Sequence, residues 1–280
     1  MILENFDIDA PLILAVAPNG ARKTKADHPA MPVTAEDCAR AAAACREAGA
    51  AMVHLHVRDP DGKHSLDADA YADAIAAVRR ETGDGMIIQM TTEAVGIYRP
   101  EEQMAAVRAV RPEAVSMAIR ELCPDEDAIG AFADFLSWLK NESISPQFIL
   151  YSPEDCERFA DLRRRGVVPY ERPFVLNVLG RYAPDQQSVP ANLLPFLQAS
   201  GDLVLDWAIC AFGPRECACA LTAAALGGHA RVGFENNIRL ADGSVAPDNA
   251  ALVGQVAAGA ALLGRRLADA DRARTHLGRL

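Results

Sequence analysis

Short apolar runs alternate with longer segments in which apolar residues recur at helical spacing, along almost the whole chain. Runs rich in valine, leucine and isoleucine are typical of buried strands, whereas apolar residues three and four positions apart indicate amphipathic helices. The runs predict strands at 12–17, 51–58, 86–91, 114–118, 147–151, 174–179, 203–209 and 230–234. The segments between them predict helices at 34–48, 68–81, 100–110, 125–140, 152–165, 214–226 and 247–267.

The order of these elements decides the fold class. Strands that alternate with helices favour a parallel sheet, and eight strands are the number that closes a (β/α)₈ barrel. An open doubly wound sheet is the alternative, but the chain lacks the Gly-x-Gly-x-x-Gly sequence of that fold. No Gly-, Ser- or Pro-rich linker divides the chain, so we expect residues 1–280 to form a single TIM-barrel domain of the α/β class.

Composition and charge narrow the class of protein. Half of the residues are hydrophobic, yet no apolar stretch is long enough to cross a bilayer, and the N-terminus lacks the basic region of a secretion signal. A net charge of −10 argues against a nucleic-acid partner. The seven cysteines are irregularly spaced and include no Cys-x-x-Cys, so we expect reduced thiols in a cytoplasmic protein.

A His-x-His pair ends the second predicted strand. Because side chains alternate across a strand, His54 and His56 share one face, and the turn sequence at 59–62 stops the strand just beyond them. Neutral imidazoles are good ligands for zinc and related divalent ions. Two histidines packed in the core are the alternative, but their position at the end of a strand favours a metal site, which needs a third ligand.

A carboxylate after the last predicted strand supplies that ligand. Closure of the barrel places the first, second and eighth strands side by side, and active sites of this fold lie where the strands end. Glu235 follows the eighth strand and therefore reaches His54 and His56. Two histidines, one carboxylate and an open position compose a catalytic rather than a structural zinc site, although manganese, iron and cobalt accept the same ligand types.

Further polar residues gather at the predicted mouth of the barrel. Arg231 lies deeper on the same face as Glu235, where a buried guanidinium either stabilises an ion network or presents its charge to the site. Two arginines at one mouth, Arg22 and Arg120, indicate an anionic small-molecule substrate. The other polar residues expected at strand ends are Asn19, Lys23, Thr91, Thr92, Glu93, Ser116 and Glu121, whereas His28, His64, His229 and His276 have no such companions. The loop at 180–189, which contains Arg181, is longer than most.

Several longer stretches of the chain resemble the β-keto acid cleavage enzyme family. The resemblance covers essentially the whole chain, and the His-x-His and Gly-Phe-Glu motifs are specific in combination. It rests on Asn19-Gly20-Ala21, Lys25-Ala26-Asp27-His28-Pro29, His54-Leu55-His56-Val57-Arg58-Asp59, Ile88-Gln89-Met90-Thr91-Thr92 and Gly227-Gly228-His229-Ala230-Arg231-Val232-Gly233-Phe234-Glu235-Asn236-Asn237.

This resemblance implies a Zn²⁺-dependent TIM-barrel enzyme that assembles as a homo-oligomer, a tetramer or a dimer. Such enzymes condense a β-keto acid with acetyl-CoA and split the adduct into acetoacetate and a new acyl-CoA. The metal ligands of the family fall on His54, His56 and Glu235. Its catalytic arginine and the hydroxyls that hold the keto acid fall on Arg231, Thr91 and Ser116.

Three positions depart from the pattern of the family's aminohexanoate-cleaving members. The acid that faces the amino group of the substrate falls on Arg22, and a glutamate of the fifth strand falls on Ile149. An arginine would repel an ammonium group, which favours an acidic or neutral keto-acid tail. The aspartate that serves as general base falls on Asn236, and an amide cannot accept a proton at neutral pH. Either another group such as Glu121 takes that role, or the chemistry differs.

Two other functions remain open from the sequence. A metal-dependent hydrolase also uses His-x-His in a barrel, but usually needs further histidines on the fifth and sixth strands, which carry none here. A non-catalytic metal-binding protein is the second alternative, because Asn236 replaces the base. The expected partners of the chain are a β-keto acid and a CoA thioester, with no nucleic acid and no membrane.

Overall fold

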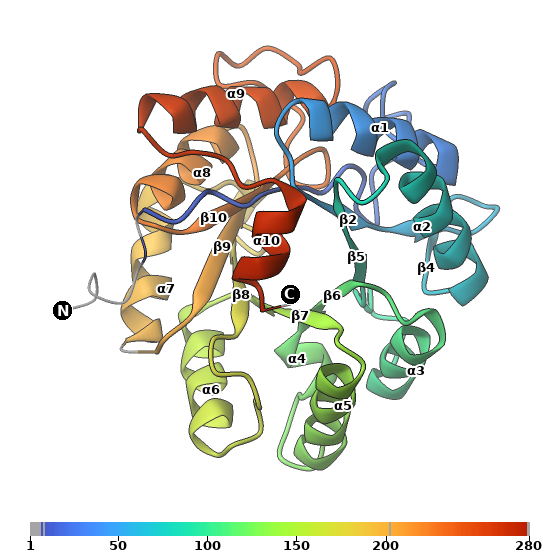
Figure 1. Ribbon diagram of the computed structural model, residues 1–280, viewed down its shortest axis with the longest axis vertical. Coiled ribbons are helices and arrows are strands. Elements are labelled where there is room, and N and C mark those ends of the chain that lie inside the picture. Colours follow the sequence, from blue (N-terminus) through green and yellow to red (C-terminus); the bar gives the residue numbers. More distant parts are fainter. Residues whose placement is uncertain (1–6, 8, 202, 279–280) are drawn as a thin grey trace.

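Eight parallel strands close into a barrel in the computed structural model, which describes residues 7, 9–201 and 203–278 (Figure 1). Residues 1–6, where no secretion signal was expected, lie outside the described part. Around the barrel the strands follow the order β1, β10, β9, β8, β7, β6, β5, β2, so the predicted (β/α)₈ architecture is confirmed. Their bounds are β1 (Leu14–Val16), β2 (Met52–Leu55), β5 (Ile87–Thr91), β6 (Ala114–Ala118), β7 (Ser145–Leu150), β8 (Phe174–Leu179), β9 (Asp206–Ala211) and β10 (His229–Val232).

Helices surround this barrel, and several begin where the sequence provides a capping side chain. Thr34, Asp67, Ser152 and Asp248 each accept a hydrogen bond from a backbone N–H of the first helical turn. The helices are α1 (Ala35–Glu47), α2 (Ala68–Thr82), α3 (Pro100–Val110), α4 (Ile119–Leu122), α5 (Ile129–Asn141), α6 (Pro153–Arg164), α7 (Leu193–Ser200), α8 (Glu216–Ala225), α9 (Asn249–Leu262) and α10 (Ala270–His276), with 3₁₀ turns at η2 (Pro184–Gln186) and η3 (Pro190–Asn192).

Strand alternation divides the core into two layers. One set of side chains, including Val53, Leu55 and Ile88, packs outward against the helices. The opposite set, including Met52 and Ile87, fills the barrel interior. Helix α10 lies across one end of the barrel in Figure 1, and its alanines join this interior cluster. The predicted metal ligands lie at the other end of the barrel.

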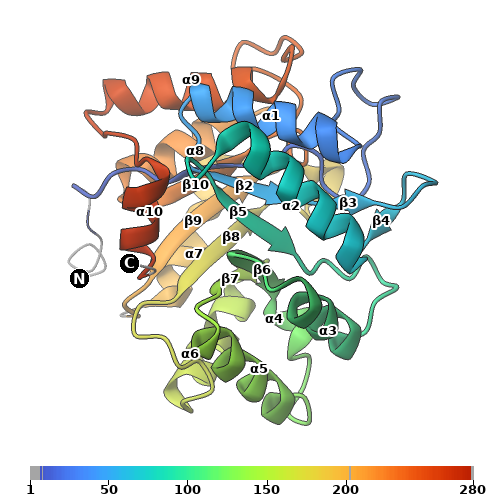
Figure 2. The ribbon, with the colours of Figure 1, turned by 45° about the vertical axis from the view of Figure 1, so that its right-hand side comes forward.

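The second strand ends earlier than its sequence predicts. Strand β2 stops at Leu55, and Val57–Arg58 (β3) instead pairs antiparallel with His64–Ser65 (β4). This hairpin projects beyond the barrel beside α2 (Figure 2). Arg58 donates hydrogen bonds to the carbonyl oxygens of Gly20 and Lys23, so it stabilises the loop after β1.

Other boundaries differ for local reasons. Helix α5 begins at Ile129 rather than at 125, because Asp125 accepts a hydrogen bond from the N–H of Ala128 within a turn. Strand β9 begins at Asp206 rather than at 203, where its register with Phe174 starts. Helices α7 and α10 were not predicted. The seven cysteines are free and buried, in agreement with their predicted role in the core. Among the described helices, none has the length and apolar character that a membrane span requires.

Candidate metal centre and active site

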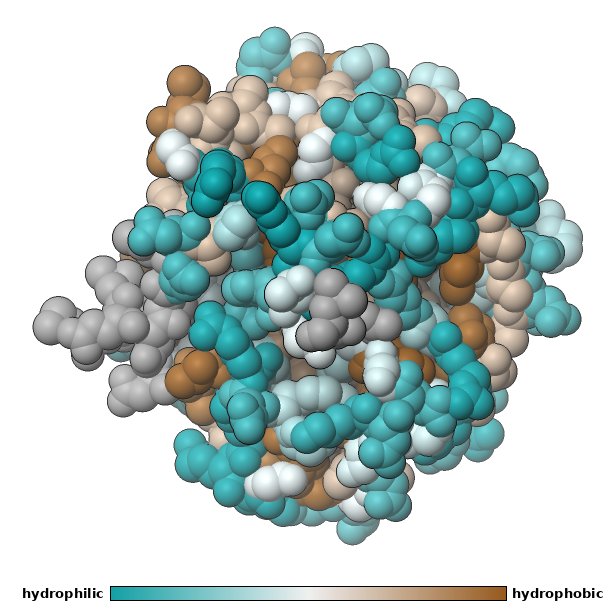
Figure 3. Space-filling model, viewed as in Figure 1, coloured by the Kyte–Doolittle hydropathy of each residue, from teal (hydrophilic) through white to brown (hydrophobic). Residues whose placement is uncertain are grey.

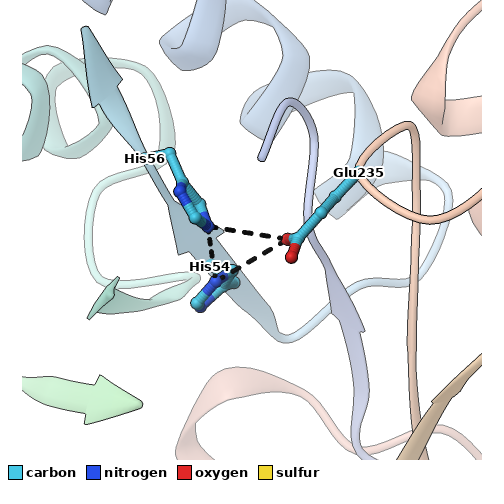
Figure 4. Close-up of side chains that lie close together, drawn as sticks. All are labelled: His54, His56 and Glu235. Carbon is cyan, nitrogen blue, oxygen red and sulfur yellow. Dashed lines mark hydrogen bonds and ion pairs between the residues drawn. The ribbon is translucent and has the colours of Figure 1, made fainter. Parts of the chain in front are cut away.

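Three predicted ligands converge at the end of the barrel where the strands terminate. His54 lies in β2, His56 directly follows it, and Glu235 lies in the turn after β10 (Figure 4). The Nε2 atoms of the two imidazoles are 3.0 Å apart, and each is 3.7 Å from Oε2 of Glu235. Strand β1 pairs with both β2 and β10, so barrel closure brings residues almost 180 positions apart into one site.

The position of Glu235 depends on two glycines. Gly233 adopts φ +136°, and a Cβ atom there would lie 2.4 Å from the carbonyl oxygen of Ala17. Gly20 adopts φ +65°, and its Cβ would lie 2.5 Å from Cγ of Glu235. Lys23 donates hydrogen bonds to the carbonyl oxygens of Phe234 and Glu235 at 2.8 and 2.6 Å. The turn after β10 is thereby fixed against the loop after β1.

The hydrogen bonds of His54 leave the correct nitrogen free to bind a metal. Its Nδ1 lies 2.8 Å from Oε1 of Gln89, an amide oxygen that only accepts, so Nδ1 carries the proton and Nε2 presents a lone pair. Gln89 is oriented in turn by Gln147, at 3.3 Å. Burial lowers the pKa of His54 to about 3 and that of His56 well below its ordinary value, which keeps both imidazoles neutral.

Charge around Glu235 favours its ionised form. Burial alone would raise the pKa of this carboxyl, but the positive charges of Arg231 and Lys23 hold it below its ordinary value. Arg231 approaches Oε1 at 3.3 Å, whereas Oε2 has no hydrogen-bond partner among the described residues. Oε2 is the oxygen that faces both histidines.

This donor set fits a zinc ion. Ligands of a tetrahedral zinc lie about 3.3 Å from one another, given bonds of about 2.0 to 2.1 Å. The three atoms here are separated by 3.0 and 3.7 Å. A buried carboxylate oxygen without a partner is costly unless a cation binds it. Two histidines and one carboxylate are also the number and kind of protein ligands found in catalytic zinc sites.

The other predicted site residues take different places. Thr91 and Arg231 line the same cavity as the ligands. Ser116 Oγ lies 3.4 Å from Nδ1 of His54, and Asn19 donates a hydrogen bond to the carbonyl oxygen of His56, so these two position the histidines. Asn236 is buried, and neither of its amide atoms has a hydrogen-bond partner in the described structure.

Arg120 and Glu121 form contacts with protein groups outside the cavity. Helix α4 places Arg120 against Asp155, at 2.6 Å, and over the ring of Tyr151. Glu121 accepts hydrogen bonds from the N–H of Ala94 and from Gln103, and burial raises its pKa. Neither residue lines the cavity that contains the metal ligands. Arg22 lies at the mouth, where it pairs with Glu93 at 3.1 Å.

Two charged residues of the cavity received no role from the sequence, although Glu93 was among the polar residues expected at the mouth and Arg181 was seen in a long loop. Glu93 lies two residues beyond β5, with Oε2 3.9 Å from Nδ1 of His56. Arg181 lies two residues beyond β8 and faces Glu93 at 3.8 Å. Both line the cavity together with the metal ligands. The place of Arg181 immediately after a barrel strand, in an unusually long loop, is the feature that could have identified it as a site residue.

A second group of ligand-type residues lies at the opposite end of the barrel. Asp206, His229 and His276 come close enough to hold a cation. However, Nδ1 of His229 accepts the N–H of Ile13, which leaves the proton on Nε2. Asp206 already accepts hydrogen bonds from Arg172 and His276, at 2.6 and 2.9 Å. These contacts join α10 to the barrel, and we assign the group a structural role.

Acidification should weaken this structural group. Burial lowers the pKa of His229 well below 6.5, so the folded protein keeps it neutral while the unfolded chain gains a proton below pH 6.5. The relevant quantity is the free energy of unfolding of the wild-type protein minus that of His229→Gln. This difference should therefore be about 2 kcal/mol smaller at pH 5.0 than at pH 7.5. Urea denaturation of both proteins at the two pH values measures this difference. Other buried acids contribute equally to both proteins, so their opposite dependence on pH cancels in the subtraction. An equal difference at both pH values would contradict it.

The fold and the arrangement of the cavity place the chain among the (β/α)₈-barrel enzymes, whose active sites lie at the carboxyl ends of the strands. The sequence profile of the beta-keto acid cleavage enzyme family matches residues 11–278. The chain belongs to this family, as its motifs predicted.

Relatives of known activity match along nearly their full length. A 3-keto-5-aminohexanoate cleavage enzyme of Fusobacterium nucleatum is 30% identical over 273 residues, which cover 95% of this chain and 97% of that one. A 3-oxoadipate:acetyl-CoA acetyltransferase of Cupriavidus necator is 28% identical over 274 residues, which cover 96% of this chain and 95% of that one.

Solved structures show the same fold at lower identity. ObcA superposes with a TM-score of 0.70 at 17% identity, over 89% of this chain and 66% of that one. A type I 3-dehydroquinate dehydratase of Clostridium difficile superposes with a TM-score of 0.60 at 9% identity, over 92% of this chain and 94% of that one.

Proposed function

We propose that this enzyme is a zinc-dependent acyltransferase that converts a β-keto acid and acetyl-CoA into acetoacetate and a new acyl-CoA. The observation that carries the proposal is the convergence of His54, His56 and Glu235 beside the buried guanidinium of Arg231. The relatives named above support it, since one carries the name of a β-keto acid cleavage enzyme and the other that of an acetyl-CoA acetyltransferase. A cytoplasmic location remains a prediction from the sequence.

The residues of the cavity suit this chemistry. When bound, zinc would supply a Lewis acid that polarises the keto group and acidifies the neighbouring carbon. Arg231 would stabilise negative charge on oxygen as it develops, because its Nε and Nη1 atoms have no partner among the described residues. The hydroxyl of Thr91 lies on the same cavity wall.

The proton on the carbon next to the keto group must be removed by a base. The amide of Asn236 cannot accept it, so a carboxylate elsewhere in the cavity is needed. Glu121, the alternative suggested by the sequence, accepts hydrogen bonds from Ala94 and Gln103 and does not line the cavity. Of the carboxylates that do line it among the described residues, Glu235 is a predicted ligand and Glu93 is the other. Glu93 therefore replaces Glu121 as the candidate for this step.

Homo-oligomer formation belongs to the same proposal. Figure 3 shows an apolar patch over one end of α9, and Leu262 and Leu263 are exposed where this helix ends. Exposed leucines next to one another on an alanine-rich helix are typical of a surface covered in an assembly.

A turnover assay tests the reaction. Zinc-loaded enzyme, acetyl-CoA and a panel of β-keto acids should yield acetoacetate and the matching acyl-CoA, detected by mass spectrometry. Enzyme stripped with a chelator should be inactive and should recover activity when zinc is restored. Loss of the keto acid without any requirement for acetyl-CoA would instead indicate a hydrolase, and the absence of an acyl-CoA product for every keto acid would refute the proposal.

A further inference from the structure

Arg181 occupies a fixed position at the mouth of the barrel. Gly180 reverses the chain directly after β8 with φ +79°, and a Cβ atom there would lie 2.8 Å from the carbonyl oxygen of Gln187. Ser188 donates a hydrogen bond to the carbonyl oxygen of Phe212, at 2.7 Å, and so fastens the loop to the end of β9. The guanidinium of Arg181 lies over the ring of Phe212, 5.3 Å from its centre. The loop therefore places this side chain in one region of the cavity.

The hydrogen-bond donors of Arg181 remain unused. Its side chain is only 16% exposed, yet its guanidinium donates no hydrogen bond to any described residue. Its nearest acid is Glu93, at 3.8 Å, and the same Oε1 atom lies closer to Arg22, at 3.1 Å. A largely buried guanidinium with free donors is a binding group for a planar anion, because a carboxylate can accept two parallel hydrogen bonds from it.

Arg181 lines two adjoining pockets, which form an inner part and an outer part of the mouth of the barrel. The inner part contains His54, His56 and Arg231, and the outer part contains the loop after β1. The residues that line both parts are Glu93, Arg181, Phe212 and Glu235. A substrate that bound at the predicted metal ligands and extended toward the mouth would therefore pass Arg181.

The charges in this cavity favour a substrate with more than one negative group. Its lining includes four cationic side chains and two carboxylates. A divalent metal would add further positive charge, and the carboxylate next to the keto group would offset only part of it. An uncompensated excess of positive charge in a confined space is unfavourable until anions bind. The cationic residues are Arg22, Lys23, Arg181 and Arg231, and the carboxylates are Glu93 and Glu235.

We propose that Arg181 binds a second carboxylate at the far end of the keto acid, so that the enzyme acts on a short β-keto dicarboxylate. This inference rests on the proposed function, because it assumes that the keto acid binds at the metal ligands. Arg22, more exposed and shared with Glu93, assists from the rim of the cavity. The phosphate groups of coenzyme A are the other anions that Arg181 could bind, and the experiment separates them from the substrate.

Matched substrates provide the test. The six-carbon dicarboxylate 3-oxoadipate and the six-carbon monocarboxylate 3-oxohexanoate differ only in the terminal carboxylate. With Arg181→Gln, the ratio of kcat/KM for the dicarboxylate to that for the monocarboxylate should fall about 100-fold, mainly through KM for the dicarboxylate. Any effect of the change on the neighbouring Glu93 acts on both keto acids and cancels in this ratio. The KM for acetyl-CoA should not change, and Arg181→Lys should recover part of the loss. Arg164→Gln, which removes an exposed arginine at the end of α6 on the opposite side of the barrel, is the control.

These experiments distinguish failure of the Arg181 assignment from failure of the proposed reaction. Equal losses for the two keto acids, or a raised KM for acetyl-CoA, would overturn the assignment of Arg181. Calorimetric titration of zinc-loaded protein with each keto acid, without acetyl-CoA, tests the same site independently of turnover. Preferential binding of the dicarboxylate that disappears in Arg181→Gln supports the carboxylate site even if no acyl-CoA forms, a result that would refute only the proposed reaction. Equal binding of the two acids by wild-type protein refutes the carboxylate site.

Discussion

Glu235→Gln is expected to abolish stable zinc binding and, with it, acyl transfer. Glutamine preserves the size of the side chain but replaces the charged oxygen that faces both histidines, at 3.7 Å, with a neutral amide. It also leaves the buried guanidinium of Arg231 without its nearest carboxylate. Changes to groups that only orient a ligand reduce metal affinity about 10- to 100-fold, so loss of a ligand itself should exceed about 100-fold.

Metal analysis after dialysis against a zinc buffer gives the direct measurement, and competition with a chromophoric chelator gives the affinity. Glu47→Gln, which neutralises an exposed acid at the end of α1, should retain the metal content of the wild-type protein. Circular dichroism distinguishes loss of the metal from loss of the fold. A Glu235→Gln protein that holds one zinc ion per chain with wild-type affinity would refute the assignment of this ligand.

The barrel and the convergence of His54, His56 and Glu235 could be predicted because both depend on patterns that are local in the sequence. Apolar runs such as Ile87–Thr91 bury both faces in a barrel, and they recur with capped helices between them. Once closure is assumed, the neighbours of β1 follow, and with them the meeting of His54 and Glu235. Alternation along one strand placed the two histidines together, even though the strand ends at Leu55.

Contacts that depend on loop conformation could not be predicted. The position of Arg181 depends on the reversal at Gly180 and on packing against Phe212, neither of which has a sequence period. Arg120 and Glu121 were expected at the mouth, but the short helix α4 directs them toward Asp155 and Gln103. The pairing of Asp206 with His276 likewise required α10, which has only seven residues and no marked amphipathic pattern.

Arg231→Lys should lower kcat about 100- to 1,000-fold while zinc content stays at one ion per chain, because removal of a single donor to a developing oxyanion typically has an effect of that size. Arg231 is buried in β10, and one of its nitrogens contacts Glu235 and Cys210. Its Nε and Nη1 atoms have no partner among the described residues. Lysine keeps the charge near Glu235 but cannot present two donors in one plane.

Steady-state kinetics with saturating acetyl-CoA would show this loss in kcat, and metal analysis of the same preparation would show that the ligands are intact. Arg158→Lys, which removes a guanidinium that donates to the carbonyl oxygen of Cys123 and does not line the cavity, serves as the matched control. An increase in KM with unchanged kcat would mean that Arg231 binds the substrate and its transition state equally. A selective loss of kcat would mean that Arg231 stabilises negative charge that develops in the transition state. The burial of its Nε and Nη1 atoms without a partner among the described residues favours this role.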